Sequence, residues 1–308
     1  MAEVIHADVL EQILITLNVK DLIRFKSVCK SWHSLITSSG FINRHLNRSY
    51  NKDRHNYEIG HRRIRLTDGS CSYTLVGSSN GLVCITSCLN SCKVLVGNPL
   101  TRELRQLPLS TIYAPSCRGF GYDSSTDDYK VLVGARKVGK NQTCVQVLSL
   151  KANVWRVIGE VKYTFMTTAG ILCNGALHWI VEDQNNKKLI ISYDLSKEEF
   201  KEIPQPEGEG CLPRFSWSSL GIMKECLCII ENSNFGDVWM MKKYNVKQSW
   251  ELLPRHRHRE IIYTIVHSFS IHKDEIFFDF KSKSSWDWDY VFRVFIMAPI
   301  FVKSLVSP

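Results

Sequence analysis

The chain has 308 residues, a formal net charge of +9 and 44% hydrophobic residues, which gives room for about two domains with sizeable cores. It contains no run of 18 apolar residues, so we expect no membrane-spanning helix and no membrane partner. The first residues include an acid and lead into no long apolar segment. We therefore expect no signal peptide and a location in the nucleus and/or the cytoplasm.

The composition also bears on metal sites and catalysis. None of the eleven cysteines forms the Cys-x-x-Cys pair that zinc sites use, so we interpret them as reduced, small buried hydrophobes. The chain lacks a Gly-x-Ser-x-Gly elbow, a His-Glu-x-x-His motif and a phosphate-binding glycine loop. We predict no metal, no cofactor and no catalytic residues.

The positive charge is concentrated in three local clusters, at residues 62–65, 136–140 and 255–259. A nucleic-acid-binding surface would interleave basic residues with exposed aromatic residues on one face. These clusters are scattered in predicted loops instead. We therefore expect no nucleic-acid partner, and a general attraction to acidic partners.

The first predicted element is an amphipathic helix that begins at residue 8. Asp8 stands where an N-cap belongs, and Glu11 follows three residues later, as in a capping box. Asn18 offers a second N-cap, before a second apolar run that ends at Ile36. The apolar residues of the first helix recur at the spacing of one helix face: Leu10, Ile13, Leu14 and Leu17.

Residues 8 to 46 carry more large apolar side chains than three short helices can hide from water. A helical unit of this size is rarely stable without a staple or a partner. The segment is therefore expected to dock onto another protein. The alternative is that its apolar face packs only against the second domain of the same chain.

The same stretch resembles an F-box, the helical module that binds a Skp-type adaptor in cullin-based ubiquitin ligases. The resemblance rests on the spacing Val9-Leu10-x-x-Ile13-Leu14-x-x-Leu17 and on the core Val28-Cys29-Lys30-Ser31-Trp32. The family usually has prolines where Ile5-His6-Ala7 and Asn18-Val19 stand here, so φ is less preset at both helix starts. The resemblance implies eleven adaptor-binding candidates: Val9, Leu10, Ile13, Leu14, Leu17, Leu22, Phe25, Val28, Cys29, Trp32 and Leu35.

Residues 47–70 are polar and charged, and we interpret them as a connector. From residue 71 the chain alternates short β-rich runs with Gly, Asn, Asp and Pro. Its first hairpin is predicted at Asn80-Gly81, because Asn-Gly is a strong signal for a two-residue hairpin turn.

The β-rich runs repeat with a period of roughly 46 to 51 residues, which is the size of a four-stranded propeller blade. Four blades are predicted between residues 72 and 254. Residues 263–306 are predicted to hold a fifth. A β-sandwich is the alternative, but it would not explain the period. The repeats are anchored at Asn98, Leu148, Asp194 and Asn245, and the predicted strands of the fifth blade are Ser268–His272, Glu275–Phe280 and Val291–Met297.

The predicted fold class is α+β multidomain. A three-helix F-box (1–46) and the connector (47–70) precede an all-β, propeller-like domain (71–308) whose last blade is irregular. The β region resembles the kelch-like F-box-associated region of plant F-box proteins, and with the F-box it covers nearly the whole chain. The phrases that carry this resemblance are Gly77–Leu82, Asn98–Arg102, Gly119–Val131, Leu177–Trp179 and Asp237–Val246.

Several side chains of the β region are of residue types that could form a site. Asp127-Asp128 is predicted to be a hairpin turn rather than a cation site, and His178 a packed or hydrogen-bonded histidine. Trp286 and Trp288 lie in a polar run and are weak candidates for binding a target protein. Four other tryptophans are predicted to pack in the core: Trp155, Trp179, Trp239 and Trp250.

Together the two resemblances imply a substrate-receptor subunit of a Skp–cullin–F-box ubiquitin ligase, which is not an enzyme by itself. The F-box would bind the adaptor and through it a cullin, and the β domain would recruit an unknown target protein. One alternative is a non-ligase interaction protein with a divergent F-box. Another is an enzyme or ligand-binding propeller, which would need polar residues at equivalent positions of successive blades, and the sequence shows none.

Overall fold

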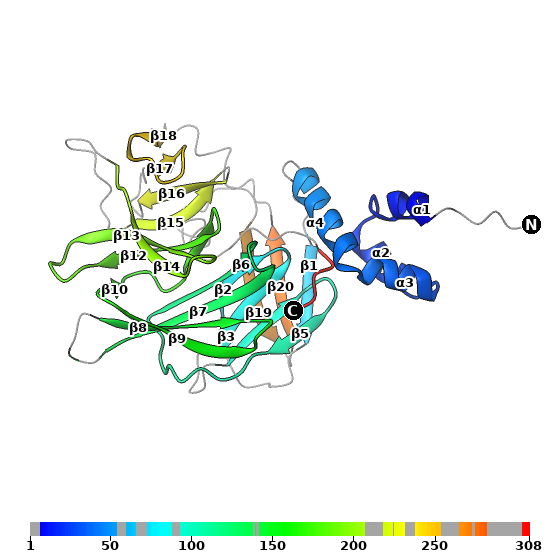
Figure 1. Cartoon of the computed structure of the whole chain (residues 1–308), viewed down its shortest axis with the longest axis horizontal. Coiled ribbons are helices and arrows are strands. Elements are labelled where there is room, and N and C mark those ends of the chain that lie inside the picture. Colours follow the sequence, from blue (N-terminus) through cyan, green and yellow to red (C-terminus); the bar gives the residue numbers. More distant parts are fainter. Residues whose placement is uncertain are drawn as a thin grey trace, which may run out of the picture.

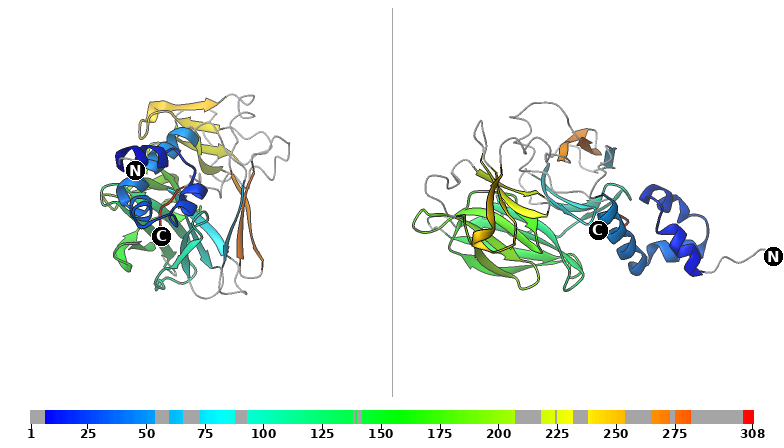
Figure 2. Two further views of the ribbon diagram at one scale, coloured as in Figure 1. Left: turned by 90° about the vertical axis from the view of Figure 1, so that its right-hand side faces the viewer. Right: turned by 90° about the horizontal axis from the view of Figure 1, so that it is seen from above.

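The computed structural model places a group of helices at one end of the molecule and a series of antiparallel sheets at the other (Figure 1). It describes residues 7–53, 60–65, 73–87, 93–137, 139, 142–206, 218–223, 225–231, 238–253, 265–272, 275–281 and 304–308. Seen from above, α4 lies between the other helices and the sheets, and the C-terminus lies beside it (Figure 2).

The N-terminal unit has four helices where three are predicted. They are α1 (Ala7–Leu14), α2 (Val19–Phe25), α3 (Lys30–Thr37) and α4 (Ser39–Asp53). The division between α3 and α4 falls at Ser38, whose backbone is extended, with φ −66° and ψ 138°. The Ser38 hydroxyl accepts a hydrogen bond from the Phe41 amide at 3.3 Å, so one residue ends one helix and caps the next.

One of the two predicted N-caps is confirmed and the other is wrong. Asn18 caps α2 as predicted, because its Oδ1 accepts a hydrogen bond from the Asp21 amide at 3.0 Å. The prediction for Asp8 is wrong, because α1 already begins at Ala7 and Asp8 lies in its first turn. Glu11 forms an ion pair with Arg44 of α4, so this carboxylate joins two helices.

Four antiparallel sheets follow in chain order, which confirms the four blades predicted between residues 72 and 254. Blade 1 consists of β2 (Tyr73–Ser79), β3 (Leu82–Ser87), β4 (Val94–Asn98) and β5 (Glu103–Gln106). Blade 2 consists of β6 (Cys117–Asp123), β7 (Asp128–Arg136), β8 (Thr143–Ser149) and β9 (Val154–Val161). Blade 3 consists of β10 (Thr164–Phe165), β11 (Ile171–Cys173), β12 (Ala176–Glu182), β13 (Lys188–Asp194) and β14 (Glu199–Ile203). Blade 4 consists of β15 (Ser218–Met223), β16 (Cys226–Glu231), β17 (Val238–Met241) and β18 (Trp250–Leu253), with a short 3₁₀ helix, η2 (Lys247–Ser249), before β18.

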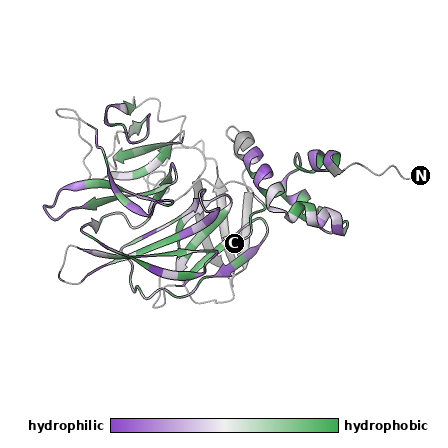
Figure 3. Ribbon diagram, viewed as in Figure 1, coloured by the Kyte–Doolittle hydropathy of each residue, from purple (hydrophilic) through white to green (hydrophobic). Residues whose placement is uncertain are grey.

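The blades meet along their first strands. Strand β2 contacts β6, β6 contacts β11 and β12, and these two contact β15. In blade 3 the first strand is divided, because β10 and β11 both pair with β12. Apolar residues run along the blade strands, as Figure 3 shows, so the core lies within and between the blades. The predicted α+β multidomain class with an all-β, propeller-like domain is confirmed.

A fifth sheet joins the two ends of the β region. Strand β1 (Gly60–Arg65) pairs antiparallel with β20 (Glu275–Lys281), which pairs with β19 (Ile265–His272). The strands predicted at 268–272 and 275–280 are therefore present, whereas the one at 291–297 lies outside the described residues. Strand β1 lies within residues 47–70, the segment that the sequence predicts to be a connector. Its sequence Gly-His-Arg-Arg-Ile-Arg has no apolar alternation, and only pairing with a segment about 200 residues away makes it a strand.

The same hydrogen bond, from a tryptophan indole to a proline carbonyl, occurs at two contacts between blades. The indole nitrogen of Trp155 on β9 donates to the carbonyl of Pro108, at the end of blade 1, over 2.8 Å. The indole nitrogen of Trp250 on β18 donates to the carbonyl of Pro204, at the end of blade 3, also over 2.8 Å. The fourth strand of one blade is thus bonded to the segment that follows the fourth strand of the blade before it.

Blades 2 and 3 share a buried ion-pair network around Lys130. Its ammonium lies 2.9 Å from Asp123 and 3.0 Å from Glu198, and its side chain is only 8% exposed. Burial alone would raise the pKa of Asp123, but hydrogen bonds from Ser125, Ser196, Lys130 and Thr126 outweigh burial and hold the pKa below its usual range. The network therefore keeps the Asp123 carboxylate ionised beside the Lys130 ammonium.

Blades 3 and 4 share a neutral contact. His178 on β12 is fully buried, with Nδ1 3.1 Å from the carbonyl of Ile171 and Nε2 2.8 Å from the hydroxyl of Tyr244. Burial lowers the pKa of His178 to about 4, against the opposing effect of backbone hydrogen bonds, so the ring is neutral near pH 7. The prediction of a packed, hydrogen-bonded histidine is confirmed.

Replacing Lys130 by Met should lower the free energy of unfolding by roughly 3 kcal/mol, because it leaves the Asp123 carboxylate buried without its cation. Chemical denaturation of the full chain measures this loss. The matched control is Lys137→Met, because Lys137 pairs with Glu160 and both side chains are more than 40% exposed. That change should cost less than about 1 kcal/mol. Equal losses in the two variants would contradict a structural role for the network.

The neutral state of His178 makes stability depend on pH. The folded-state pKa, about 4, lies below the ordinary histidine pKa of 6.5, so only the unfolded chain takes up this proton as the pH falls between those values. Stability from this group is full above pH 6.5 and is lost toward pH 4. Between pH 7 and pH 5 the wild type should lose roughly 2 kcal/mol more than His178→Gln. His33→Gln, at an exposed site, is the control and should follow the wild type.

Candidate protein-binding surface on the N-terminal helices

The four helices enclose a small apolar core. Its buried members come from all four helices and from the C-terminal tail: Leu14, Val19, Leu22, Ile36, Phe41 and Leu305. The ring of Phe25 packs edge-on against Trp32, with centroids 5.5 Å apart, where α2 meets α3. Because these residues fill the core, only the other apolar side chains of the helices are available at the surface.

The eleven predicted binding residues divide into three groups by exposure. Leu14 and Leu22 are 1% and 0% exposed, so they belong to the core. Val9, Ile13 and Val28 are 49%, 50% and 57% exposed, and Cys29 is also exposed. The remaining residues are partly buried against the core: Leu10, Leu17, Phe25, Trp32 and Leu35.

The exposed group is the candidate surface. Val9 and Ile13 are one helical turn apart on α1, so they lie on the same outer face. Val28 stands at the corner between α2 and α3. A large apolar side chain that stays half exposed beside the core stabilises the fold little, so these three side chains are available for a partner to bury. We define Val9, Ile13 and Val28 as the exposed apolar group.

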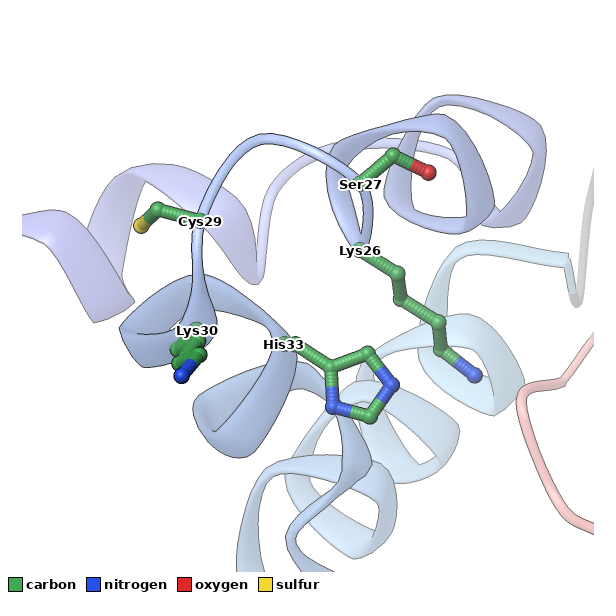
Figure 4. A pocket seen from close by; sticks show the side chains of 5 residues that line it. All are labelled: Lys26, Ser27, Cys29, Lys30 and His33. Atoms are coloured by element: carbon green, nitrogen blue, oxygen red, sulfur yellow. The ribbon is translucent and has the colours of Figure 1, made fainter.

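An open pocket of about 380 Å³ lies beside Val28, lined by Lys26, Ser27, Cys29, Lys30 and His33. Figure 4 shows the side chains of Lys26, which follows α2, and His33, on α3, extending in the same direction. Two lysines give this pocket a positive charge, which suits acidic groups on a partner. Sequence periodicity could not find it, because the pocket is formed by the corner between two helices.

The acids and tryptophans of the β region that the sequence singles out have structural roles where the structure describes them. Asp127 ends the turn between β6 and β7, with φ 50°, and Asp128 begins β7 opposite Asp123, so the predicted hairpin turn is confirmed. The four tryptophans predicted to pack are buried or partly buried. Only Trp155 and Trp250 occupy equivalent positions, since Trp179 lies on a second strand and Trp239 on a third. Trp286 and Trp288 lie outside the described residues.

The described part of the chain shows no metal-binding cluster and no helix suited to a membrane. In those residues no three His, Cys, Asp or Glu side chains come together to hold a metal ion. No helix there is both long and apolar enough to cross a bilayer. Cys84, Cys117, Cys173 and Cys228 are buried, and burial raises the pKa of Cys173 to about 12. These four therefore act as small buried hydrophobes, as predicted.

Comparison with known families agrees with this division of the chain. Residues 6–44 match the F-box domain, and residues 42–297 match the F-box associated beta propeller domain. The second match covers more than half of the chain. An F-box joined to an F-box-associated domain is, in general, the organisation of a substrate receptor that binds a Skp-type adaptor.

Several proteins of Arabidopsis thaliana are similar to this chain. F-box protein CPR1 is 30% identical over 296 residues, which are 80% of this chain and 71% of that protein. F-box/kelch-repeat protein At3g23880 is 30% identical over 80% of this chain and 78% of its own length, and F-box protein At3g07870 is 28% identical over 80% and 71%. The chain therefore belongs to the family of F-box proteins that carry an F-box-associated β-propeller domain.

Proposed function

We propose that this protein is the substrate-receptor subunit of a Skp–cullin–F-box ubiquitin ligase. The F-box binds the adaptor and, through it, a cullin, and the propeller holds a target protein. The observation that carries the proposal is the exposed apolar group of Val9, Ile13 and Val28 on a helical unit whose core is already closed. Such a surface is stable in water only at a cost, which burial against a partner removes.

The proposed role requires no catalytic residue in this chain. A receptor accelerates ubiquitin transfer by holding the lysines of the target near a conjugating enzyme that carries ubiquitin. This raises the effective concentration of those lysines. The gain depends on a stiff connection between the two binding modules, since a mobile one spreads the target over a larger volume. The networks between blades 2, 3 and 4 supply that stiffness within the β region.

The target-binding surface is less defined than the adaptor-binding one. The described β region exposes large apolar side chains on several elements: Leu109 and Tyr113 before β6, Val154 and Val157 on β9, Met166 after β10, Val246 before η2, and Leu252 on β18. These positions are spread over blades 2, 3 and 4 and over the connection between blades 1 and 2. Target recruitment by the propeller therefore rests on family membership and not on one surface.

The sharpest test of adaptor binding uses the exposed residues. Leu14 is unsuitable, because a charge at a 1% exposed position would disrupt the core. Val28→Asp and Ile13→Asp place a charge where an adaptor would bury an apolar side chain. Each should weaken binding of purified Skp-type adaptor by about 30-fold, or roughly 2 kcal/mol, without lowering the melting temperature of the β domain.

The matched control is Val157→Asp, because Val157 is 58% exposed, against 57% for Val28, but lies on β9 of the propeller. It should leave adaptor affinity unchanged in a calorimetric titration. Undiminished adaptor binding by both F-box variants would overturn the proposed surface. A wild-type chain that binds no Skp-type adaptor would overturn the ligase function itself.

A further inference from the structure

The last five residues of the chain lie between the F-box and blade 1. Leu305 is 2% exposed and belongs to the apolar core of the F-box, together with Leu14 and Phe41. Leu100, from the turn between β4 and β5, packs against the same core. On the other side, Val306 packs against the apolar cluster that blades 1 and 2 share. Adjacent tail residues therefore enter the cores of two different domains.

Polar contacts attach this tail to blade 1. Asn98, at the end of β4, is fully buried, and its amide nitrogen donates to the carbonyls of Ser304 and Val306 over 3.0 and 2.8 Å. The hydroxyl of Ser304, also fully buried, donates to the carbonyl of Asn80 in the β2–β3 turn. The hydroxyl of Ser307 donates to Glu103 on β5 over 2.7 Å. Three separate points of blade 1 thus bond the tail.

Comparison with blade 3 shows what is special about Asn98. In both blades the third strand ends in the same turn, in which a residue with positive φ donates its amide to the carbonyl four residues earlier: Arg102 to Asn98, and Glu198 to Asp194. Both side chains accept a local amide, from Leu100 and from Ser196, at 2.9 Å. A carboxylate is sufficient for that turn. The amide of Asn98 adds two N–H donors, and both are used on the tail.

We propose that residues 304–308 form a clasp that fixes the F-box on blade 1, with Asn98 and Leu305 as its positioning residues. The inference deepens the proposed receptor function and rests on it. Because Leu305 completes the F-box core while the rest of the tail is bonded to blade 1, the two domains move as one body. The clasp therefore sets where a target on the propeller lies relative to the adaptor.

Asn98→Asp is the decisive variant. It keeps the size of the side chain and the acceptor for the Leu100 amide, but it removes both donors to the tail and faces the carbonyls of Ser304 and Val306 with a carboxylate. Asp194→Asn is the matched control, since it makes the reverse exchange at the equivalent turn of blade 3, where the described structure shows no tail. A chain that ends at residue 303 removes the clasp altogether.

Two measurements on the full chain, alone and with adaptor, test the clasp. The first is the distance distribution between labels at Ser34 on α3 and Lys187 on blade 3, both exposed. The second is hydrogen exchange at the amides of Leu305, Val306 and Ser307. We expect one narrow distance in the wild type and in Asp194→Asn, and a broadened one in Asn98→Asp and the truncated chain. Tail exchange should rise about tenfold in Asn98→Asp, as expected for losing about 1.4 kcal/mol of hydrogen bonding.

The outcomes separate the clasp from the receptor function. If Asn98→Asp and the truncated chain keep the narrow distance, and tail exchange in Asn98→Asp is unchanged, the clasp is overturned. If Asn98→Asp broadens the distance while its adaptor affinity equals that of the wild type, the tail positions the F-box without forming the adaptor site. A wild-type chain that binds no adaptor overturns the receptor function, and the distance measurement on the free chain still decides the clasp.

Discussion

The apolar core of the F-box is the constraint on which the rest of the arrangement depends. The four helices do not complete this core alone: it takes in Leu305 from the C-terminal tail and rests against Leu100 of blade 1. Burying a leucine side chain contributes about 2 kcal/mol, a sizeable share of the stability of so small a unit. The side chains that remain outside, Val9, Ile13 and Val28, are left for a partner.

The propeller provides the other half of a stiff receptor. Each pair of neighbouring blades is joined by a specific contact: Trp155 to a carbonyl of blade 1, Lys130 to acids of blades 2 and 3, and His178 to Tyr244 of blade 4. These contacts differ in charge, so they respond differently to pH. The contribution of the ion pair to stability falls only when the pH drops into the usual carboxyl range, where the unfolded chain protonates Asp123 first, whereas the contribution of the neutral histidine falls already below about pH 6.5.

Features that depend on neighbouring residues could be predicted from the sequence. The Asn80-Gly81 and Asn174-Gly175 turns both have the positive φ pairs that Asn-Gly favours, and Asn18 caps its helix. Features that depend on distant partners could not. The sequence of β1 is that of a polar connector, and it forms a strand because it pairs with the distant β20. The residues around Asn98 and Leu305 likewise do not indicate that these two side chains join the tail to blade 1 and to the F-box core.

Local sequence is also insufficient to define the candidate protein-binding surface on the helices. Periodicity places Leu10, Ile13, Leu14 and Leu17 on one helix face. In the structure α1 ends at Leu14, so Leu17 lies beyond the helix, and periodicity cannot say which part of the face the protein covers itself. The other helices and the tail decide this: Leu14 is enclosed, whereas its neighbour Ile13 stays half exposed. A face that looks uniform in sequence is thus divided in the structure between an internal core and a surface for another protein.

The exposed part of this divided face is the proposed binding site for a Skp-type adaptor. Hydrogen exchange of the full chain, measured with and without purified adaptor, locates the surface that the adaptor covers. We expect new protection in α1 and at the corner between α2 and α3, around Ile13 and Val28, with no change in β9 around Val157. Unchanged exchange in the helices at saturating adaptor, or protection confined to the propeller, would contradict it.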